Sequence, residues 1–129
     1  MKVAINGFGS IGRIVLRQAL KNENIEVVGI NDLTSVDTLA YLFKYDSIHK
    51  MYDGSVSVDN GDLIIDGKRI KVSAIKDPAQ LPWGELGVDF VVESTGIFRS
   101  LETASLHLKA GAKKVMVSAP PKGAGIKAY

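Results

Sequence analysis

Short runs of apolar, mostly β-branched residues recur along the chain and alternate with segments of helical periodicity. The apolar runs are Val3–Ile5, Ile25–Ile30, Val88–Val92 and Lys114–Val117. Near-continuous runs of this kind are typical of strands buried on both faces of a parallel sheet. Between them, apolar residues at helical spacing predict helices over Ile11–Lys21, Ser35–Lys44 and Leu101–Ala110. Strands that alternate with helices predict an α/β fold of βαβ units with a mainly parallel, doubly wound sheet.

One stretch, Ser55–Ile75, departs from this alternation. Its short apolar runs are separated by Asp59-Asn60-Gly61-Asp62 and by Asp66-Gly67-Lys68. Asn-Gly and Asp-Gly pairs favour tight hairpin turns. We therefore expect a small antiparallel meander, over about 55–75, inserted before the next parallel strand. After it, Asp77-Pro78 predicts a short helical turn that ends over Leu81–Gly84.

The last residues of the chain, Lys122–Tyr129, contain Gly123 and Gly125 and show no periodicity. This composition predicts a loop. The chain would then stop just after a strand, as a segment cut from a longer protein would. A length of 129 residues suits one domain with a core of its own, so residues 1–129 are expected to form a single domain.

Composition narrows the possible functions. Hydrophobic residues make up 46% of the chain and charged residues 23%, an ordinary globular balance. A net charge of +2 gives no support for a nucleic-acid or membrane partner. The sequence contains no cysteine, which excludes a thiolate metal site and a cysteine nucleophile among these residues. Met1 leads straight into a strand-like segment, without the apolar stretch of a signal peptide, so we expect a soluble, cytoplasmic protein.

The segment Gly7-Phe8-Gly9-Ser10-Ile11-Gly12 matches the pattern G-x-G-x-x-G. The pattern alone is weak, but here a strand precedes it and a helix follows it, as in dinucleotide-binding folds. In such a turn Gly7 permits the tight bend, Gly9 lets the backbone approach a pyrophosphate, and Gly12 lets the helix pack close to the strand. The helix would then offer the N–H groups of Ser10 and Ile11 to an anion.

An acidic residue completes this fingerprint. Asp32 follows the second predicted strand, at about 20 residues beyond the last glycine of the pattern. At the end of that strand it can accept hydrogen bonds from the ribose hydroxyls of an adenosine, and its charge would repel a 2′-phosphate. The motif therefore predicts NAD rather than NADP as cofactor. The alternative is that the glycines serve only a tight turn and that Asp32 caps the next helix.

Beyond this motif, the whole chain resembles phosphorylating glyceraldehyde-3-phosphate dehydrogenase. The opening Val3–Arg13 is similar to the start of that family, and further similar segments follow in the same order. These are Ile30–Thr34, Leu42–His49, Asp77-Pro78, Leu81–Trp83, Glu93–Phe98, Ala110–Val115 and Ser118–Pro120. The resemblance implies a Rossmann-type NAD-binding domain.

The resemblance also implies roles for individual positions. The residues expected to contact the cofactor are Asn6, Gly7, Phe8, Gly9, Ser10, Ile11, Gly12, Asn31, Asp32, Lys76, Ser94, Thr95, Gly96, Phe98, Ser118 and Ala119. Among them, Phe98 would lie beside the adenine, and Ser118 and Ala119 would lie nearer the nicotinamide. The motif-bearing positions follow strand ends, where ligands bind open α/β sheets.

Three positions depart from the family pattern. Ser10 stands where the family usually has arginine, which removes a cation near the pyrophosphate. Lys76 stands where arginine is common and could still reach the adenine edge, although without a planar fork. Lys50 replaces a glycine after His49.

The resemblance places the family's catalytic groups outside this chain. Its nucleophilic cysteine, in a Ser-Cys-Thr-Thr-Asn segment, is expected a little beyond Tyr129, and the general-base histidine and the phosphate-binding residues are expected further on. The C-terminal helix that packs back onto the nucleotide domain would also be absent. We therefore expect a chain that binds NAD without catalysing the reaction, and whose uncovered apolar surface favours self-association or contact with a catalytic domain.

The remaining histidine, arginine, hydroxyl and acidic side chains give no pattern of a catalytic or metal site. His49 lacks a cysteine partner, and His107 is predicted to lie on an exposed helix face, so neither is assigned as an acid or base. Arg13 and Arg17 are expected to be solvated. Ser94-Thr95 lacks the G-x-S-x-G context of a hydrolase. The acidic residues Asp46, Asp53, Asp59 and Asp62 lack the spacing of an EF-hand.

Two other functions remain open at this point. The chain could be half of a dehydrogenase that is completed by a separate catalytic chain. It could also bind RNA, a role for which its small net charge gives little support.

Overall fold

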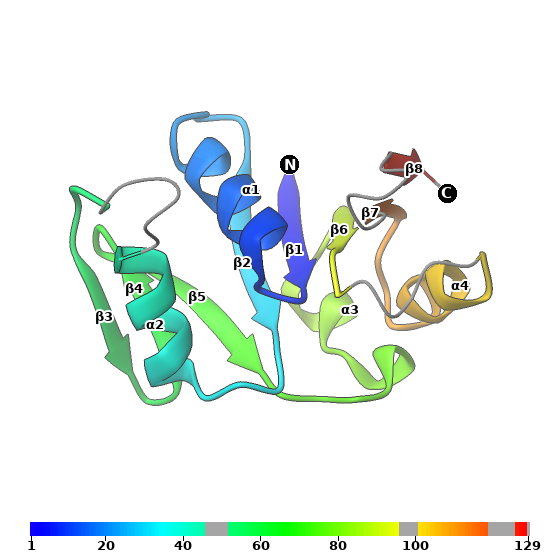
Figure 1. Cartoon of the computed structure of the whole chain (residues 1–129). Helices are drawn as coiled ribbons and strands as arrows, with labels where there is room; N and C mark the ends of the chain where they lie inside the picture. Colours follow the sequence, from blue (N-terminus) through cyan, green and yellow to red (C-terminus); the bar gives the residue numbers. More distant parts are fainter. Residues whose placement is uncertain (46–51, 96–100, 119–125, 129) are drawn as a thin grey trace.

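The computed structural model describes residues 1–45, 52–95, 101–118 and 126–128 (Figure 1). Strands and helices alternate along the chain, as the apolar pattern predicts. In order they are β1 (Lys2–Asn6), α1 (Ser10–Leu20), β2 (Glu26–Asn31), α2 (Val36–Tyr45), β3 (Val56–Asp59), β4 (Asp62–Ile65), β5 (Lys68–Ser73), the 3-10 helix η1 (Pro78–Gln80), α3 (Trp83–Leu86), β6 (Phe90–Glu93), α4 (Leu101–Lys109), β7 (Lys114–Ser118) and β8 (Ile126–Ala128).

The strands of the described residues form one sheet in the order β3-β4-β5-β2-β1-β6-β7-β8. The five central strands, from β5 to β7, are parallel, whereas β3 and β4 at one edge and β8 at the other are antiparallel to their neighbours. The order reverses at β1, because the chain adds β2 and β5 on one side of β1 and then β6 and β7 on the other. This is the switch point at which doubly wound folds bind ligands.

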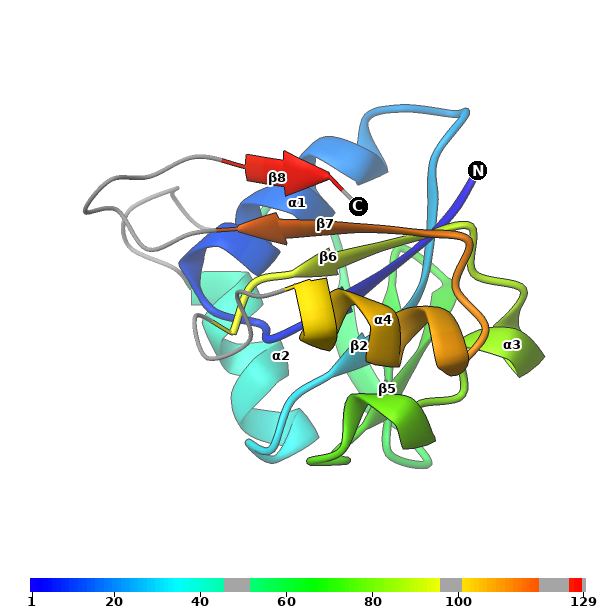
Figure 2. The ribbon, with the colours of Figure 1, turned by 90° about the vertical axis from the view of Figure 1, so that its right-hand side faces the viewer.

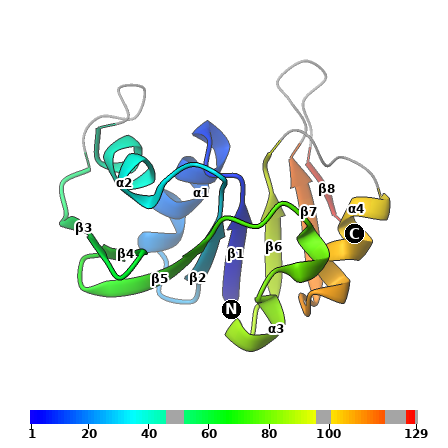
Figure 3. The same cartoon turned by 90° about the horizontal axis from the view of Figure 1, so that it is seen from below.

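Helices cover the two faces of the sheet and create two cores (Figure 3). On one face, α1 and α2 contribute Leu16 and Phe43 to a core that also contains Ile5 of β1. On the other, Trp83 of α3 and residues of α4 pack over Ala4 of β1, and α4 lies against β7 (Figure 2). The neighbours Ala4 and Ile5 therefore serve opposite cores, as the pleat of a strand requires.

The meander differs in one respect from its prediction. Its two hairpin turns form as expected, and Asn60-Gly61 and Asp66-Gly67 have the positive φ angles that a two-residue turn of this kind requires. The antiparallel meander itself is confirmed, but its last strand has a second pairing that the sequence does not indicate. Strand β5 pairs antiparallel with β4 and parallel with β2, so the last meander strand is itself the third parallel strand.

Three boundaries also differ from the sequence-based prediction. The expected helical turn over Asp77–Gly84 is two elements, because η1 ends at Gln80 and α3 begins at Trp83. The run at Val88–Val92 becomes a strand only from Phe90. In the tail, which was predicted to be a loop, Ile126–Ala128 forms β8 beside β7. Three residues are too few to show periodicity. In the part of the chain that the structure describes, no helix has the length and apolarity to span a bilayer.

Candidate cofactor-binding site

The turn between β1 and α1 is held by close contacts that only glycine permits at two positions. Gly7 has φ of +92°, and a Cβ there would lie 2.7 Å from the backbone N of Thr95. A Cβ on Gly12 would lie 2.6 Å from the carbonyl oxygen of Gly7 and 3.0 Å from Cγ2 of Ile5. Gly7 thus allows β1 to bend sharply beside the end of β6, and Gly12 lets α1 pack directly on the turn.

Gly9 has a different environment. No heavy atom lies within 4 Å of the position that its Cβ would occupy. It precedes the first residue of α1 and gives that helix no side-chain cap. The first N–H groups of a helix lack intrahelical acceptors. The turn therefore presents a helix N-terminus beside an open space, as anion-binding helix termini do.

Asp32 lies directly after β2 and braces this turn. Its Oδ2 accepts a hydrogen bond from the N–H of Phe8 at 2.7 Å, and its Oδ1 accepts one from the N–H of Thr34 at 2.9 Å. The first contact joins the end of β2 to the glycine turn that follows the neighbouring strand β1. The second fixes the start of the segment that leads into α2.

These elements surround a pocket of about 520 Å³ at the C-terminal ends of the central strands. Small-molecule pockets fall in the range of about 300–1,000 Å³. The residues that line it are Asn6, Gly7, Gly9, Asn31, Asp32, Leu33, Ile75, Lys76, Ser94 and Thr95. Of these described lining residues, Asp32 and Lys76 alone are charged. The site therefore contains one carboxylate and one exposed ammonium group in otherwise neutral surroundings.

The structure brings most of the expected residues together, with some differences. Among the predicted residues, Phe8, Ser10, Ile11 and Gly12 are not part of the pocket lining. The Phe8 side chain does not face the pocket, because it is only 1% exposed and its ring centroid lies 6.0 Å from that of Phe43. Phe8 meets Asp32 through its backbone instead. Ser118 ends β7, and Gly96, Phe98 and Ala119 lie outside the described residues.

Two lining residues were not expected from the sequence. Leu33 is 60% exposed and Ile75 is half-buried beside Lys76. Each is an apolar residue just beyond a strand, so in the sequence it resembles a continuation of the apolar run. Their position after the strand ends was the only signal that could have identified them.

A buried polar network lies beneath the pocket. Asn31 donates from Nδ2 to Oδ1 of Asn6 at 2.8 Å and to the carbonyl oxygen of Ile75 at 2.9 Å. Its Oδ1 accepts hydrogen bonds from Oγ of Ser73 at 2.8 Å and from the N–H of Ile75 at 2.9 Å. On the far side, Oγ of Ser94 donates to the carbonyl oxygen of Gly7 at 2.6 Å. Side chains therefore tie together the ends of β1, β2, β5 and β6.

His107 belongs to this network, and its predicted exposure is wrong. The side chain is 0% exposed, and its Nε2 lies 2.6 Å from Oε1 of Glu93, which is also 0% exposed. Its Nδ1 accepts a hydrogen bond from Nε1 of Trp83 at 3.0 Å. The sequence of α4 gives no sign of this inward-facing position. A buried histidine is costly unless its ring nitrogens are hydrogen-bonded, and its partners Trp83 and Glu93 lie elsewhere in the sequence.

Arg13 and Arg17 were also expected to be solvated, and both are half-buried. Nη1 of Arg13 donates to the carbonyl oxygen of Phe8, and Nη2 of Arg17 donates to that of Phe43, each at 3.0 Å. The Arg17 guanidinium lies 5.4 Å from the Phe43 ring centre. Their place on the face of α1 that meets the turn and α2 explains this burial.

The candidate acidic residues form no metal cluster within the described ranges. Asp62 is buried beside Arg69, with Oδ2 at 3.0 Å from Nη1, and its Oδ1 accepts the N–H of Val72 at 3.0 Å. Burial favours the neutral form of Asp62, but the Val72 N–H, Arg69 and Lys71 outweigh this effect and lower its pKa. Asp59 also pairs with Arg69. Asp46 and His49 lie outside the described residues, and so does Lys50.

Comparison with known proteins agrees with this geometry. Residues 1–101 match the family model described as glyceraldehyde 3-phosphate dehydrogenase, NAD binding domain. Glyceraldehyde-3-phosphate dehydrogenase of Thermotoga maritima is 61% identical over 127 residues, which are 97% of this chain and 38% of that protein. That of Geobacillus stearothermophilus is 59% identical over 126 residues, again 38% of its length.

A fungal relative gives the same result. Glyceraldehyde-3-phosphate dehydrogenase 1 of Kluyveromyces lactis is 58% identical over 125 residues, which are 96% of this chain and 38% of that protein. The chain thus spans well under half the length of the relatives it matches. It belongs to the glyceraldehyde-3-phosphate dehydrogenase family and carries that family's NAD-binding domain, with NAD as its cofactor.

Proposed function

We propose that residues 1–129 act as one nucleotide-binding unit that holds NAD across the C-terminal ends of β2, β1 and β6. The observation that carries this proposal is the convergence, in one pocket, of the open space at Gly9 with the carboxylate of Asp32 and the turn at Thr95. The adenosine half of the cofactor would occupy the pocket. Lys76 would lie at the adenine edge.

The pyrophosphate would lie against Gly9 and the N-terminus of α1. The space in front of Gly9 admits a ligand to the backbone, and the N–H groups of Ser10 and Ile11 supply donors together with the helix dipole. Asp32 would accept hydrogen bonds from the ribose hydroxyls. Its negative charge disfavours a 2′-phosphate, so NAD should bind more tightly than NADP.

The remaining expected contacts extend the same path. Gly96 and Phe98 follow the pocket residues Ser94 and Thr95 in the sequence. Ser118 is the last residue of β7, and Ala119 comes directly after it. We propose that these four residues serve the adenine and nicotinamide ends of the cofactor, as the family resemblance implies. NAD supplies a hydride acceptor when it is bound.

The oxidation of glyceraldehyde 3-phosphate is part of the proposal only for a longer protein. That reaction uses a cysteine nucleophile in the family, and this sequence contains no cysteine. We therefore assign cofactor binding, without turnover, to these 129 residues. We further propose that the protein acts in the cytoplasm, which contains dissolved NAD.

We also propose that the chain associates with itself through an apolar hollow beside α1. This hollow measures about 850 Å³, and its apolar lining includes Val3, Ile14, Val15, Phe90, Val92 and Met116. Apolar surface of this kind marks contact sites in soluble proteins. Size-exclusion chromatography with light scattering should show a mass that rises with concentration. A constant monomer mass would reject self-association.

Calorimetric titration with NAD, NADP and ADP tests the proposed function. We expect saturable binding of NAD and ADP with similar affinities, because the structure supplies the adenosine half of the site, and much weaker binding of NADP. Asp32→Asn removes the charge but keeps an acceptor for the Phe8 N–H, so it should weaken NAD binding and reduce the preference over NADP. Equal affinities for NAD and NADP in the unchanged protein would reject the assigned role of Asp32.

A further inference from the structure

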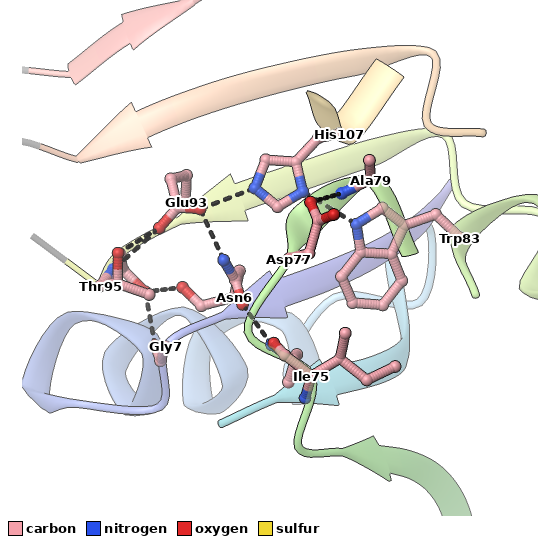
Figure 4. A network of polar contacts seen from close by, with 11 residues as sticks. Asn6, Gly7, Ile75, Asp77, Ala79, Trp83, Glu93, Thr95 and His107 are labelled. Carbon is pink, nitrogen blue, oxygen red and sulfur yellow. Dashed lines mark hydrogen bonds and ion pairs between the residues drawn. The ribbon is translucent and has the colours of Figure 1, made fainter. Parts of the chain in front are cut away.

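Glu93 is the last residue of β6 and lies directly beneath the pocket without lining it. Its side chain is fully buried and receives four hydrogen bonds (Figure 4). Oε1 lies 2.6 Å from Nδ2 of Asn6 and 2.6 Å from Nε2 of His107. Oε2 accepts from the backbone N–H of Thr95 at 3.0 Å and from its hydroxyl at 2.7 Å. The carboxyl group therefore joins three elements, β1, α4 and the turn after β6.

The direction of these hydrogen bonds follows from their chemistry. Nε1 of Trp83 can only donate, so Nδ1 of His107 must accept and carries no proton. His107 is then neutral, with its proton on Nε2, and donates to Glu93. Asn6 can donate only from Nδ2. An ionised carboxylate accepts all four bonds, which makes Glu93 the group on which the donors of this network converge.

This convergence determines how two pocket amides are oriented. Because Nδ2 of Asn6 faces Glu93, its Oδ1 must face Nδ2 of Asn31. The Oδ1 of Asn31 is then left to accept from the N–H of Ile75. Asn6, Asn31, Ile75 and Thr95 all line the pocket. A reversal of polarity at Glu93 would therefore be transmitted to residues on two sides of it.

We propose that Glu93 is a positioning residue for the nucleotide: its buried carboxylate holds the Thr95 turn and the amides of Asn6 and Asn31 in the orientation that the bound nucleotide meets. Glu93 makes no contact with the ligand in this scheme. The inference rests on the proposed function, since it concerns the pocket assigned there to the adenosine half of NAD. Glu93 would thus contribute to nucleotide affinity although it is fully buried in the core.

Glu93→Gln is an informative substitution because it keeps the shape and changes one acceptor into a donor. If the new amide nitrogen faced Asn6 and His107, it would meet two donors. If it faces Thr95, the hydroxyl can rotate to accept, but the Thr95 N–H loses this acceptor. The second arrangement is less costly. The main change should therefore fall on the Thr95 turn at the pocket wall.

The experiment compares Glu93→Gln with Val91→Ala in the full chain. Val91 lies two residues earlier on the same face of β6, fully buried in the core, and does not line the pocket. Both variants should lose thermal stability. At a temperature where both remain folded, Glu93→Gln should bind ADP about tenfold to a hundredfold more weakly, and Val91→Ala should bind it as the unchanged protein does.

Nuclear magnetic resonance gives a readout that loss of stability alone would not move. In Glu93→Gln, the Thr95 backbone amide, which loses its acceptor, and the side-chain amide of Asn6, whose acceptor loses its charge, should shift in the absence of nucleotide, whereas in Val91→Ala they should not. Unchanged ADP affinity in folded Glu93→Gln would overturn the proposal. Equal losses of affinity in both variants would also overturn it, because the effect would then be one of general stability.

A measurement on the unchanged protein covers the case in which Glu93→Gln does not fold. The imidazole nitrogen shifts of His107 should show a neutral ring with a bare Nδ1 and a protonated Nε2. A proton on Nδ1 would contradict the direction of the network and overturn the inference. If the unchanged protein fails to bind ADP while His107 has the expected tautomer, the proposed function fails and the affinity role of Glu93 fails with it, whereas the network itself stands.

Discussion

Gly9→Ala separates the proposed pyrophosphate contact from the stability of the turn. In the structure, the Cβ of an alanine at this position would meet no heavy atom within 4 Å. The backbone of Gly9, with φ of −82° and ψ of −160°, is in a region that alanine also adopts. The protein without ligand should therefore accept the substitution, while a ligand lying against the backbone should not.

The expected change in stability is small because two effects oppose each other. Alanine is a poorer residue than glycine just before a helix, at a cost of about 0.5–1 kcal/mol. It also restricts the unfolded chain, which stabilises the fold by about 0.4–1 kcal/mol. The free energy of unfolding should thus change by less than about 0.5 kcal/mol. For the complex, a methyl group in the ligand's space costs about 1–3 kcal/mol, or about fivefold to 150-fold in affinity.

Gly12→Ala is the matched comparison in the same turn. Its Cβ would lie 2.6 Å from a backbone oxygen, so the substitution should destabilise the fold even though alanine favours helices. The assay combines thermal unfolding, followed by circular dichroism, with calorimetric titration of ADP and NAD. Gly9→Ala should lose affinity without loss of stability, and Gly12→Ala should lose stability. Unchanged nucleotide affinity in Gly9→Ala would refute the placement of the pyrophosphate against Gly9.

Two further predictions concern charged groups. Asp62 has a lowered pKa in the folded chain, so its contribution to stability is present above the unfolded value of about 4 and is lost as the pH falls through the lower folded pKa. Asp62→Asn should reduce the free energy of unfolding at pH 7 by about 1–3 kcal/mol, and the decline of this free energy below about pH 4 should become less steep. An unchanged acid profile in denaturant titrations would contradict this prediction. Ser10→Arg should strengthen NAD binding several-fold at low salt, because it adds an exposed cation near the pyrophosphate. Most of this gain should be lost at high salt, which screens the charge. If the NAD titration curves of the variant were equal at both salt concentrations, the phosphates would lie elsewhere.

Local pattern was sufficient to predict the strand–turn–helix unit around Gly7, Gly9 and Gly12. The apolar run, the glycine spacing and the helical periodicity all lie within about 20 residues, so no knowledge of distant contacts is required. The turn pairs Asn60-Gly61 and Asp66-Gly67 were predictable for the same reason, since their positive φ angles suit these residues. The strand ends then placed Asp32 and Thr95 at one edge of the sheet.

Features that depend on distant partners could not be predicted in this way. The pairing of β5 with β2 on one edge and with β4 on the other is a property of the assembled sheet. His107 has a polar side chain on a helix with a weak apolar stripe, and its burial becomes favourable only when Glu93 and Trp83 are brought beside it. The burial of the Phe8 ring likewise depends on a distant partner, Phe43 of α2.

The most direct test of the central claim is a nuclear magnetic resonance titration of the isotopically labelled chain with NAD. The backbone amides of Gly7, Gly9, Asp32 and Thr95 should move together and saturate, while those of Gly61 and Gly67, in the distant hairpin turns, stay fixed. That result would place NAD in the pocket at the ends of β1, β2 and β6. An absence of saturable shifts at the four pocket residues up to millimolar NAD, or shifts confined to the hollow beside α1, would contradict the account.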